Sequence, residues 1–299
     1  MNDQAEMLRR LIKKTNGETS DNPVIDDPVV NKKARVIAVT SGKGGVGKTS
    51  IAVNLAIRLS MRGLKVVILD FDFGLANVDV LFGTIPRYTL LDVIRGEKDI
   101  LEVLADGPAN IKFLSGGSGV EELVKLDRKQ IRNILANISI LDKLFDVVII
   151  DTAAGLSRNV MNFVLAADQV LLVTTPEPTA ITDAYALVKM VSRRDLKKQI
   201  GIIINNAETL REAESVANKL CLVSDKFLSL KLSKLGYILY DDNVTKSVKL
   251  QKPFILYNSK CSAAKGIAEI ADRMFLGTNE KIVQGAKGFM SKLLSFFSV

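Results

Sequence analysis

The chain has 299 residues, of which 47% are hydrophobic and 25% are charged, and its formal net charge at pH 7 is +8. This length accommodates one large α/β domain or at most two domains, and the basic balance permits anionic partners such as lipid head groups, nucleic acid or nucleotide without selecting among them. The sequence contains no histidine, which excludes a histidine general base, a Ser-His-Asp triad and a histidine-ligated zinc site.

The N-terminal segment, residues 1–33, combines a short helical pattern with a linker. In "MNDQAEMLRRLIKK" the apolar residues fall on one helical face, and the stretch lacks the apolar core of a secretory signal. The rest of the segment holds two prolines and many polar side chains, which favours a linker. Nowhere does the chain approach the roughly 20 consecutive apolar residues of a transmembrane helix. We therefore expect a cytosolic protein.

Residues 34–276 show strand and helix patterns in alternation. Apolar, β-branched runs occur at 35–40, 64–70, 111–114, 146–151, 169–174, 200–205 and about 236–240. Helical patterns lie at about 48–61, 122–143, 180–194, 208–220 and 260–275. Because most strand runs are continuously apolar, we expect an α/β domain with a doubly wound, mainly parallel sheet, which binds ligands at the carboxyl ends of its strands. Cys221 and Cys261 have no CxxC spacing and are interpreted as reduced core residues.

The C-terminal segment, residues 277–299, has an apolar stripe at helical spacing with lysines beside it. One interpretation is a last helix that docks on the domain. The other is an amphipathic membrane-targeting helix, with apolar side chains in the acyl boundary and lysines at anionic head groups. The two can alternate if the helix is docked in a monomer and released in a dimer. The predicted membrane residues are Phe289, Met290, Leu293, Leu294, Phe296 and Phe297.

A glycine-rich stretch, "GKGGVGKT", follows the first predicted strand and precedes the first helix of the domain. It fits the phosphate-loop pattern GxxxxGK[ST], in which backbone N–H groups and the helix N-terminus surround phosphates. Lys48 should reach the β- and γ-phosphates of a nucleotide, and the Thr49 hydroxyl should bind Mg²⁺. The expected ATP-binding residues here are Gly42, Lys43, Gly44, Gly45, Val46, Gly47, Lys48, Thr49 and Ser50.

Two further strand ends carry carboxylates. "ILDFDFG" supplies Asp70 and Asp72, and "VVIIDTAAG" supplies Asp151. A strand-end aspartate often only caps a helix. A metal-bound triphosphate, however, needs acidic partners and a group that orients the attacking water, and these three carboxylates converge on the edge that holds the phosphate loop.

With a lysine at the second position of its loop, "KGGVGKT" resembles the deviant Walker A motif of the MinD/ParA ATPases, and "DFDFGLANVD" (70–79) and "DTAAG" (151–155) resemble that family's two switch regions. The resemblance implies a P-loop NTPase that binds ATP and Mg²⁺. It implies that Lys43 acts in trans on the nucleotide of a second copy, and that Asp72 orients the hydrolytic water. Asp70 and Asp151 would then help to hold Mg²⁺ with Thr49 and Asp72, the carboxylates largely through water.

The resemblance to this family implies two further ATP-binding residues, which would contact the adenine base. Asn205, which ends the run "GIIIN", matches an asparagine that contacts adenine. Where relatives have "G-x-I-P-x-D", this chain has "GYILYDD" (236–242), with Leu239 in place of proline. Asp241 is the expected ATP-binding residue of this stretch. Because the sequence offers no strong general base, we expect slow, Mg-dependent ATP hydrolysis that is activated in the dimer.

Four features resemble the flagellar branch of the family, the FlhG proteins (also called YlxH or FleN): "DQAEMLR" (3–9), "FLSGGSG" (113–119), "TTPEPTAITDAYALVK" (174–189) and the phenylalanine-rich end. The resemblance implies an ATP-bound homodimer that regulates flagellar number or placement, cytoplasmic and peripheral at the inner face of the cell membrane when ATP-bound. It implies an anionic membrane surface, the SRP-type GTPase FlhF and flagellar basal-body components as partners. The FlhF contact would use Asp3, Gln4, Leu8 and Arg9.

Three other functions are weighed against this one. A division-site MinD typically begins almost at its first strand, without such an N-terminal segment. A ParA-type DNA-segregation ATPase would need a basic DNA surface and salt-sensitive DNA binding; we do not expect DNA as a partner. An iron–sulfur carrier needs paired cysteine ligands, which Cys221 and Cys261 do not supply.

Overall fold

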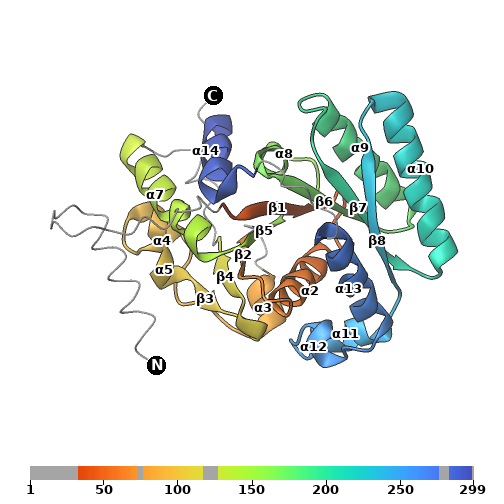
Figure 1. Ribbon diagram of the computed structural model, residues 1–299, viewed down its shortest axis with the longest axis horizontal. Helices are drawn as coiled ribbons and strands as arrows, with labels where there is room; N and C mark the ends of the chain where they lie inside the picture. The colour runs from red at the N-terminus through yellow and green to blue at the C-terminus, as the bar shows by residue number, and fades with distance from the viewer. Residues whose placement is uncertain (1–32, 73–76, 117–126, 276–282, 298–299) are drawn as a thin grey trace, which may run out of the picture. The chain divides into compact units, whose positions relative to one another are not determined.

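A sheet of eight strands is the centre of the computed structural model, which describes residues 33–72, 77–116, 127–275 and 283–297 (Figure 1). The strand order is β3-β4-β2-β5-β1-β6-β7-β8. Neighbouring strands are parallel, except for β3 and β4, which are antiparallel. The strands are β1 (Arg35–Thr40), β2 (Val66–Phe71), β3 (Ala105–Asp106), β4 (Lys112–Ser115), β5 (Val147–Thr152), β6 (Gln169–Thr174), β7 (Ile200–Ala207) and β8 (Leu232–Leu239).

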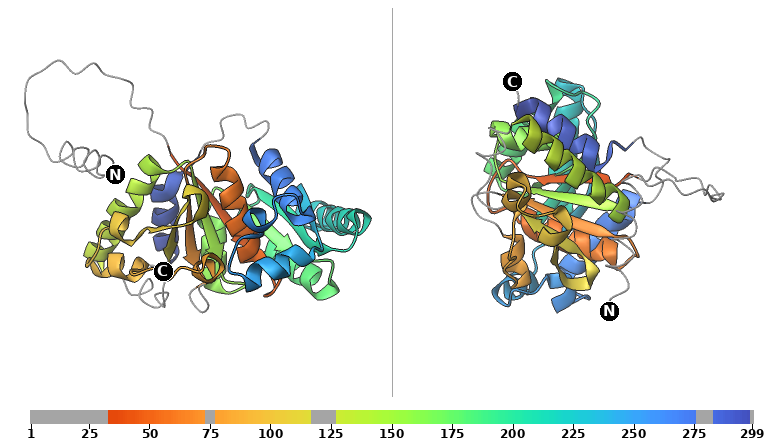
Figure 2. Two further views of the ribbon diagram at one scale, coloured as in Figure 1. Left: turned by 90° about the horizontal axis from the view of Figure 1, so that it is seen from below. Right: turned by 90° about the vertical axis from the view of Figure 1, so that its left-hand side faces the viewer.

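Helices cover both faces of this sheet (Figure 2). The long ones are α2 (Lys48–Ser60), α7 (Arg128–Leu144), α8 (Arg158–Ala166), α9 (Pro178–Ser192), α10 (Leu210–Leu228), α13 (Ser262–Phe275) and α14 (Gly285–Phe297). On one face, Ile37 and Val39 of β1 pack with α2 and α13. On the other face, Val36 and Ala38 pack with α7, α8 and α14, and α9 and α10 cover β6 and β7. The predicted doubly wound, mainly parallel α/β fold is confirmed.

The strand register brings the carboxyl ends of β1, β2 and β5 to one edge. Asp70 in β2 lies beside Asp151 in β5, and Asp151 lies beside Val39 in β1. The loop that follows β1 therefore begins next to both carboxylates. In open α/β sheets this edge is the usual place for a ligand.

The sequence pattern does not predict several short elements within the described ranges, because each is too short to show a helical or strand period. Besides β3 these are α3 (Val78–Phe82), α4 (Leu90–Arg95), α5 (Ile100–Val103), the 3₁₀ helix η1 (Pro108–Asn110), α11 (Asp242–Lys249) and α12 (Phe254–Tyr257). Several boundaries differ from the predictions. Helix α10 extends to Leu228, beyond the predicted end at about 220. Strand β8 begins at Leu232, before the predicted start at about 236, and the pattern missed this start because the polar, exposed Ser233 and Lys234 interrupt it.

Helix α14 is docked against α7 and α8 (Figure 1). Phe289, Met290, Leu293 and Leu294 are at most 5% exposed, while Phe296 and Phe297 are half-buried against the same core. This is the docked arrangement weighed in the sequence analysis, and the membrane role of these residues stays a prediction. Within the described ranges, no helix has the length and apolar character needed to cross a membrane.

Two carboxylates fasten the start of α14 to the start of β1. Asp142 accepts hydrogen bonds from the backbone N–H groups of Ala34 and Ala286 at 3.1 and 2.6 Å. Asp168 accepts from those of Val36 and Gln284, both at 2.9 Å. Because a carboxylate at a helix N-terminus satisfies N–H groups that lack a partner within the helix, these contacts favour the docked position.

Candidate nucleotide-binding site

The loop between β1 and α2 has the backbone shape that its glycines allow. Gly45 and Gly47 have φ angles of +79° and +86°, in the left-handed region where a side chain is strained. A Cβ at Gly47 would collide with the side-chain amide of Asn205, whereas a Cβ at Gly44 or Gly45 would meet no atom within 4 Å. The loop is thus packed on its inner side and open on the side of the cavity.

A cavity of about 670 Å³ opens over this loop and joins it to both switch regions. Its volume lies within the range of small-molecule sites. Its lining contains the predicted Asp72 and two backbone positions after β5, Ala153 and Ala154. The lining residues of the loop and of α2 are Ser41, Gly44, Gly45, Gly47, Lys48, Thr49 and Ser50.

Lys48 and Asp151 form a buried ion pair at the base of the cavity. The Lys48 ammonium lies 2.9 Å from Asp151 Oδ1, and the two side chains are 7% and 0% exposed. Burial raises the pKa of Asp151, and the Lys48 charge and a hydrogen bond from Thr49 oppose that rise. A carboxylate that is removed from water needs such a partner to stay ionised.

Asp70 holds the start of the first switch region. Its Oδ1 accepts from the N–H of Asp72 at 3.0 Å, and its Oδ2 accepts from those of Asn77 and Val78 at 3.1 and 3.2 Å. Burial and the nearby charge of Asp151 raise the pKa of Asp70 to about 7, against these backbone hydrogen bonds. Through these hydrogen bonds Asp70 positions the backbone of Asp72. A role of Asp70 in holding Mg²⁺ stays a prediction.

The second lysine of the loop points to a partner that sequence reasoning missed. Lys43 Nζ lies 2.6 Å from Glu177 Oε2 and 3.0 Å from Thr179 Oγ1, at the start of α9. The side chain of Lys43 is 39% exposed and that of Glu177 is 61% exposed. The stretch 174–189 contains both partners, but its pattern gave no sign of this contact because the two segments meet only in the folded sheet.

The two residues that we expect to contact the adenine base, Asn205 and Asp241, lie at the ends of neighbouring strands, but their polar groups form hydrogen bonds within the protein. The side-chain amide of Asn205 donates a hydrogen bond to the carbonyl of Val46 at 2.8 Å and so stabilises the conformation of the phosphate loop. Asp241 caps α11 and accepts from the N–H groups of Asn243 and Ala263 at 2.9 and 3.1 Å. Burial alone would raise the pKa of Asp241, but these hydrogen bonds outweigh it and lower the pKa. Their contact with a base stays a prediction.

The donor set fits Mg²⁺ only if a nucleotide completes it. In the part of the chain that the structure describes, no three His, Cys, Asp or Glu side chains group closely enough to hold a metal ion. Mg²⁺ usually takes one or two carboxylates together with phosphate oxygens and water. Asp151 Oδ2 is buried and has no hydrogen-bond partner among the described residues, and Thr49 lines the adjoining cavity. These two residues suit an ion that also binds phosphate.

The four predicted FlhF residues, Asp3, Gln4, Leu8 and Arg9, lie outside the described residues.

Comparison with known proteins identifies the class of this site. A family model named ParA, described as an NUBPL iron-transfer P-loop NTPase, matches residues 32–275. The antiactivator FleN of Pseudomonas aeruginosa is 42% identical over 250 residues, which cover 83% of this chain and 89% of FleN. The flagellum site-determining protein YlxH of Helicobacter pylori is 32% identical over 306 residues, which cover 99% of each chain.

The solved structure of the septum site-determining protein MinD from Pyrococcus horikoshii, in complex with Mg-ADP, has a similar fold. Its TM-score is 0.66 at 26% identity, over 81% of this chain and 96% of that chain. The chain belongs to the ParA/MinD family of P-loop NTPases. The predicted resemblance to this family and to its flagellar proteins is confirmed, and the Mg-ADP complex of a neighbour supports nucleotide and Mg²⁺ binding.

Proposed function

We propose that this protein is a slow Mg-dependent ATP hydrolase that dimerises on binding ATP and regulates flagellar number or placement. The observation that carries the proposal is one cavity in which Lys48, Thr49 and Asp72 meet, with Lys43 partly exposed beside it. Because Lys48 would already serve the nucleotide of its own chain, Lys43 is available for the nucleotide of a second copy.

Three groups of the chain would act during hydrolysis, together with bound Mg²⁺. Lys48 would transfer its hydrogen bond from Asp151 to the phosphates, which leaves Asp151 available to the metal site. Backbone N–H groups of the loop would stabilise the charge that develops on the transferred phosphoryl group. Asp72 would orient the attacking water. Bound Mg²⁺ would neutralise part of the phosphate charge. With one carboxylate and no histidine to activate water, the rate should be low, as suits a switch.

Dimerisation would require Lys43 to leave Glu177 and Thr179. These contacts are at the surface, where an ion pair is worth about 0.2–1 kcal/mol, so the lysine is easily released. In the dimer it would meet the phosphates of the second copy, in the manner of an arginine finger. ATP would then hold the two copies together, and hydrolysis would let them separate.

Helix α14 would connect dimerisation to a membrane. Released from α7 and α8, it would present Phe289, Met290 and Leu293 to the acyl boundary, with Lys287 at anionic head groups. A single helix should bind marginally, and two helices in one dimer should bind much more tightly through effective concentration. The protein would thus be cytoplasmic in one state and peripheral at the membrane in the other.

The flagellar role rests on the names of two relatives, an antiactivator FleN and a flagellum site-determining protein YlxH. We propose that residues 1–33 act on the GTPase FlhF, with Asp3, Gln4, Leu8 and Arg9 in the contact, and that basal-body components are further partners. The test is the GTPase rate of purified FlhF with the full chain, with Gln4→Ala and with a chain that lacks residues 1–33. An unchanged rate with all three would refute this partner and leave division-site placement as the alternative function.

Two variants test the nucleotide cycle by size-exclusion chromatography with light scattering. Asp72→Ala should keep ATP binding and accumulate dimers, because hydrolysis is lost. Lys43→Ala should bind nucleotide but stay monomeric. An ATP-dependent dimer of Lys43→Ala with the affinity of the natural chain would refute the action in trans.

Vesicle co-sedimentation with ADP or with ATP tests the membrane step. The full chain should bind anionic vesicles much more tightly with ATP than with ADP, and deletion of residues 280–299 should abolish this ATP-dependent binding. Because α14 packs on the core, Lys287→Glu serves as a second variant: its side chain is exposed, so the fold should survive while binding weakens. Equal sedimentation of Lys287→Glu and the natural chain would count against an electrostatic contribution from this helix.

A further inference from the structure

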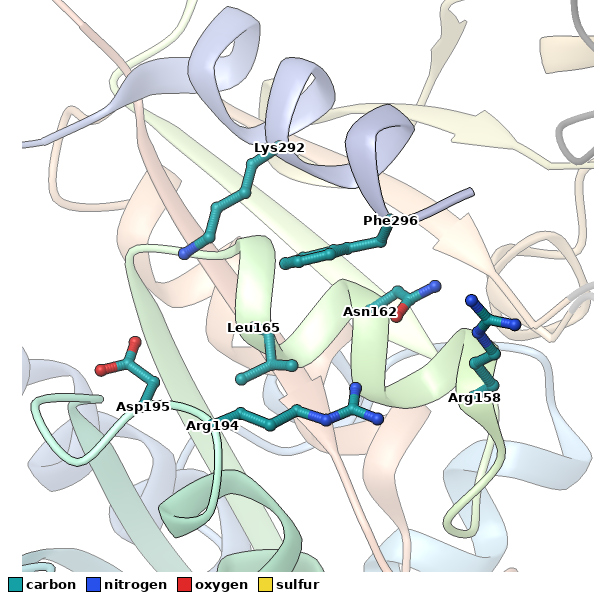
Figure 3. A pocket seen from close by; sticks show the side chains of 7 residues that line it. All are labelled: Arg158, Asn162, Leu165, Arg194, Asp195, Lys292 and Phe296. Carbon is teal, nitrogen blue, oxygen red and sulfur yellow. The ribbon is translucent and has the colours of Figure 1, made fainter. Parts of the chain in front are cut away.

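A second cavity, of about 550 Å³, opens between α8, the turn that follows α9, and α14 (Figure 3). It shares no lining residue with the nucleotide cavity. We define it by its lining and call it the α8–α14 cavity: Arg158, Asn162, Leu165, Arg194, Asp195, Lys292 and Phe296. Neither the family relation nor the proposed nucleotide cycle assigns it a ligand.

Basic groups predominate in the α8–α14 cavity. Arg158, Arg194 and Lys292 line it, and within the described ranges no carboxylate lies within ion-pair distance of any of the three. The one acid, Asp195, accepts a hydrogen bond from the N–H of Lys197 at 3.0 Å. Three cations and one carboxylate line the hollow, so its net charge is positive, and an anion bound there would reduce the repulsion among the cations.

The ammonium of Lys198, close to the cavity, is affected by the positive charge of Lys292. Its ammonium is buried and donates to the carbonyls of Leu165 and Ala167, at the end of α8. Burial, and then the charge of Lys292, lower the pKa of Lys198 to about 8. The charge of Lys292 is therefore felt at the end of α8, next to Leu165 of the cavity lining.

Asn162 supplies a hydrogen-bond donor that nothing else uses. It is 2% exposed, and among the described residues its side-chain nitrogen has no hydrogen-bond partner. Figure 3 shows its amide inside the cavity, between Phe296 and Arg194 and toward Arg158. A buried donor without a partner costs about 1–3 kcal/mol, and a ligand that accepts from it removes that cost.

The remaining lining is apolar. In Figure 3 the ring of Phe296 lies across the cavity above Leu165 and the stem of Arg194. Such a mixture, a few convergent polar groups on an apolar floor, is typical of small-molecule sites. A free inorganic anion would leave the floor without a contact.

We propose that the α8–α14 cavity binds a phosphate ester that carries an apolar or partly apolar body. Arg158 and Arg194 would bind the phosphate oxygens through their planar forks, and Lys292 would add a point charge. The Asn162 amide would donate a hydrogen bond, and Phe296 and Leu165 would pack against the body. The ester is either the head group of an anionic phospholipid or a soluble organic phosphate.

Binding would also hold α14 in place. Lys292 and Phe296 belong to α14, whereas Arg158, Asn162 and Arg194 belong to the body of the fold, so the ligand is in contact with both. A ligand that binds only the docked form shifts the docking equilibrium in favour of that form. At one hundred times its dissociation constant, the shift is about 100-fold.

Calorimetric titration of the full chain tests the proposal with two probes, dioctanoylphosphatidylglycerol below its micellar concentration and sn-glycerol 3-phosphate. Saturating Mg-ADP keeps the probes out of the nucleotide cavity. The double variant Arg158→Ala/Arg194→Ala should weaken binding at least tenfold. The matched control Arg193→Ala removes an exposed arginine next to Arg194 that does not line the cavity, and it should stay within twofold of the natural chain.

Asn162→Leu separates a ligand contact from a structural one. Because it removes an unpaired amide from an apolar wall, the melting temperature without probe should hold or rise, while probe binding should fall three- to tenfold. A lipid that binds at least tenfold better than glycerol phosphate would identify a membrane head group, and equal affinities would identify a soluble ester. Absence of heat with both probes, equal losses with Arg193→Ala and the double variant, or unchanged binding by Asn162→Leu would overturn the proposal.

Discussion

Phe289 is one of the buried side chains that dock α14 on the body of the fold. It is 1% exposed, and its ring lies 6.5 Å from that of Phe163 at an interplanar angle of 22°. Phe163 in turn stacks on Phe71 at 4.7 Å, so the three rings connect α14 through α8 to the last residue of β2. Phe289→Ala would leave a cavity at the outer end of this stack.

The size of the effect follows from the burial. Truncation of a buried phenylalanine to alanine costs about 3–5 kcal/mol, from lost transfer free energy and the cavity left behind. If only the docked form bears this cost, the docking equilibrium of α14 shifts by about 10²- to 10⁴-fold toward release. The strands of the sheet should keep their stability, since none of their hydrogen bonds involves α14.

Hydrogen exchange measured by mass spectrometry distinguishes the stability of α14 from that of the sheet. Peptides from residues 285–297 should exchange faster by about the same factor in Phe289→Ala, while peptides from β1 and β5 keep their protection. Ser291→Ala, an exposed change on the same helix, is the control and should alter neither. Equal loss of protection in α14 and in the sheet would refute release of α14 as a separate unit, and unchanged exchange in α14 would refute its burial here.

Three further predictions concern the nucleotide cavity. Gly47→Ala should lower the free energy of unfolding of the nucleotide-free protein by at least about 1 kcal/mol, because Gly47 has a φ of +86° and a Cβ there would collide with a neighbouring amide. The control Gly44→Ala should change this free energy by less than about 0.5 kcal/mol. Equal denaturation midpoints for the two variants would contradict this prediction. The pKa of Asp70, about 7 in the folded state against 3.8, means that its protonated form stabilises the fold and that this stability is lost as the pH rises. Between pH 5 and 8 the unfolding free energy should fall by about 3 kcal/mol relative to Asp70→Asn in urea titrations, and parallel profiles would show that Asp70 does not titrate in this range. Glu177→Gln should tighten ATP-dependent dimerisation up to about fivefold by freeing Lys43, as light scattering would show; a weaker dimer would mean that the glutamate serves the dimer itself.

Local sequence was sufficient to predict the phosphate loop because its requirements are local. Gly45 and Gly47 must adopt positive φ, and Lys48 must follow at the first turn of a helix. The continuously apolar strands likewise predicted a parallel sheet, because only strands covered on both faces have that composition. The short helices α3, α4 and α5 could not be predicted, since one or two turns show no period and depend on packing for stability.

The sequence by itself thus determined the fold class, the phosphate-loop motif and the carboxylates that lie at the same edge of the sheet. The tertiary structure decided which partners these groups have: Asp151 for Lys48, and Glu177 for Lys43, more than 100 positions away in the chain. It also placed the stripe of α14 in the core, although its composition suits a membrane equally well. The physical reason is that apolar periodicity records that a helix face must leave water, whereas the surface that covers it depends on which distant segments the fold brings together.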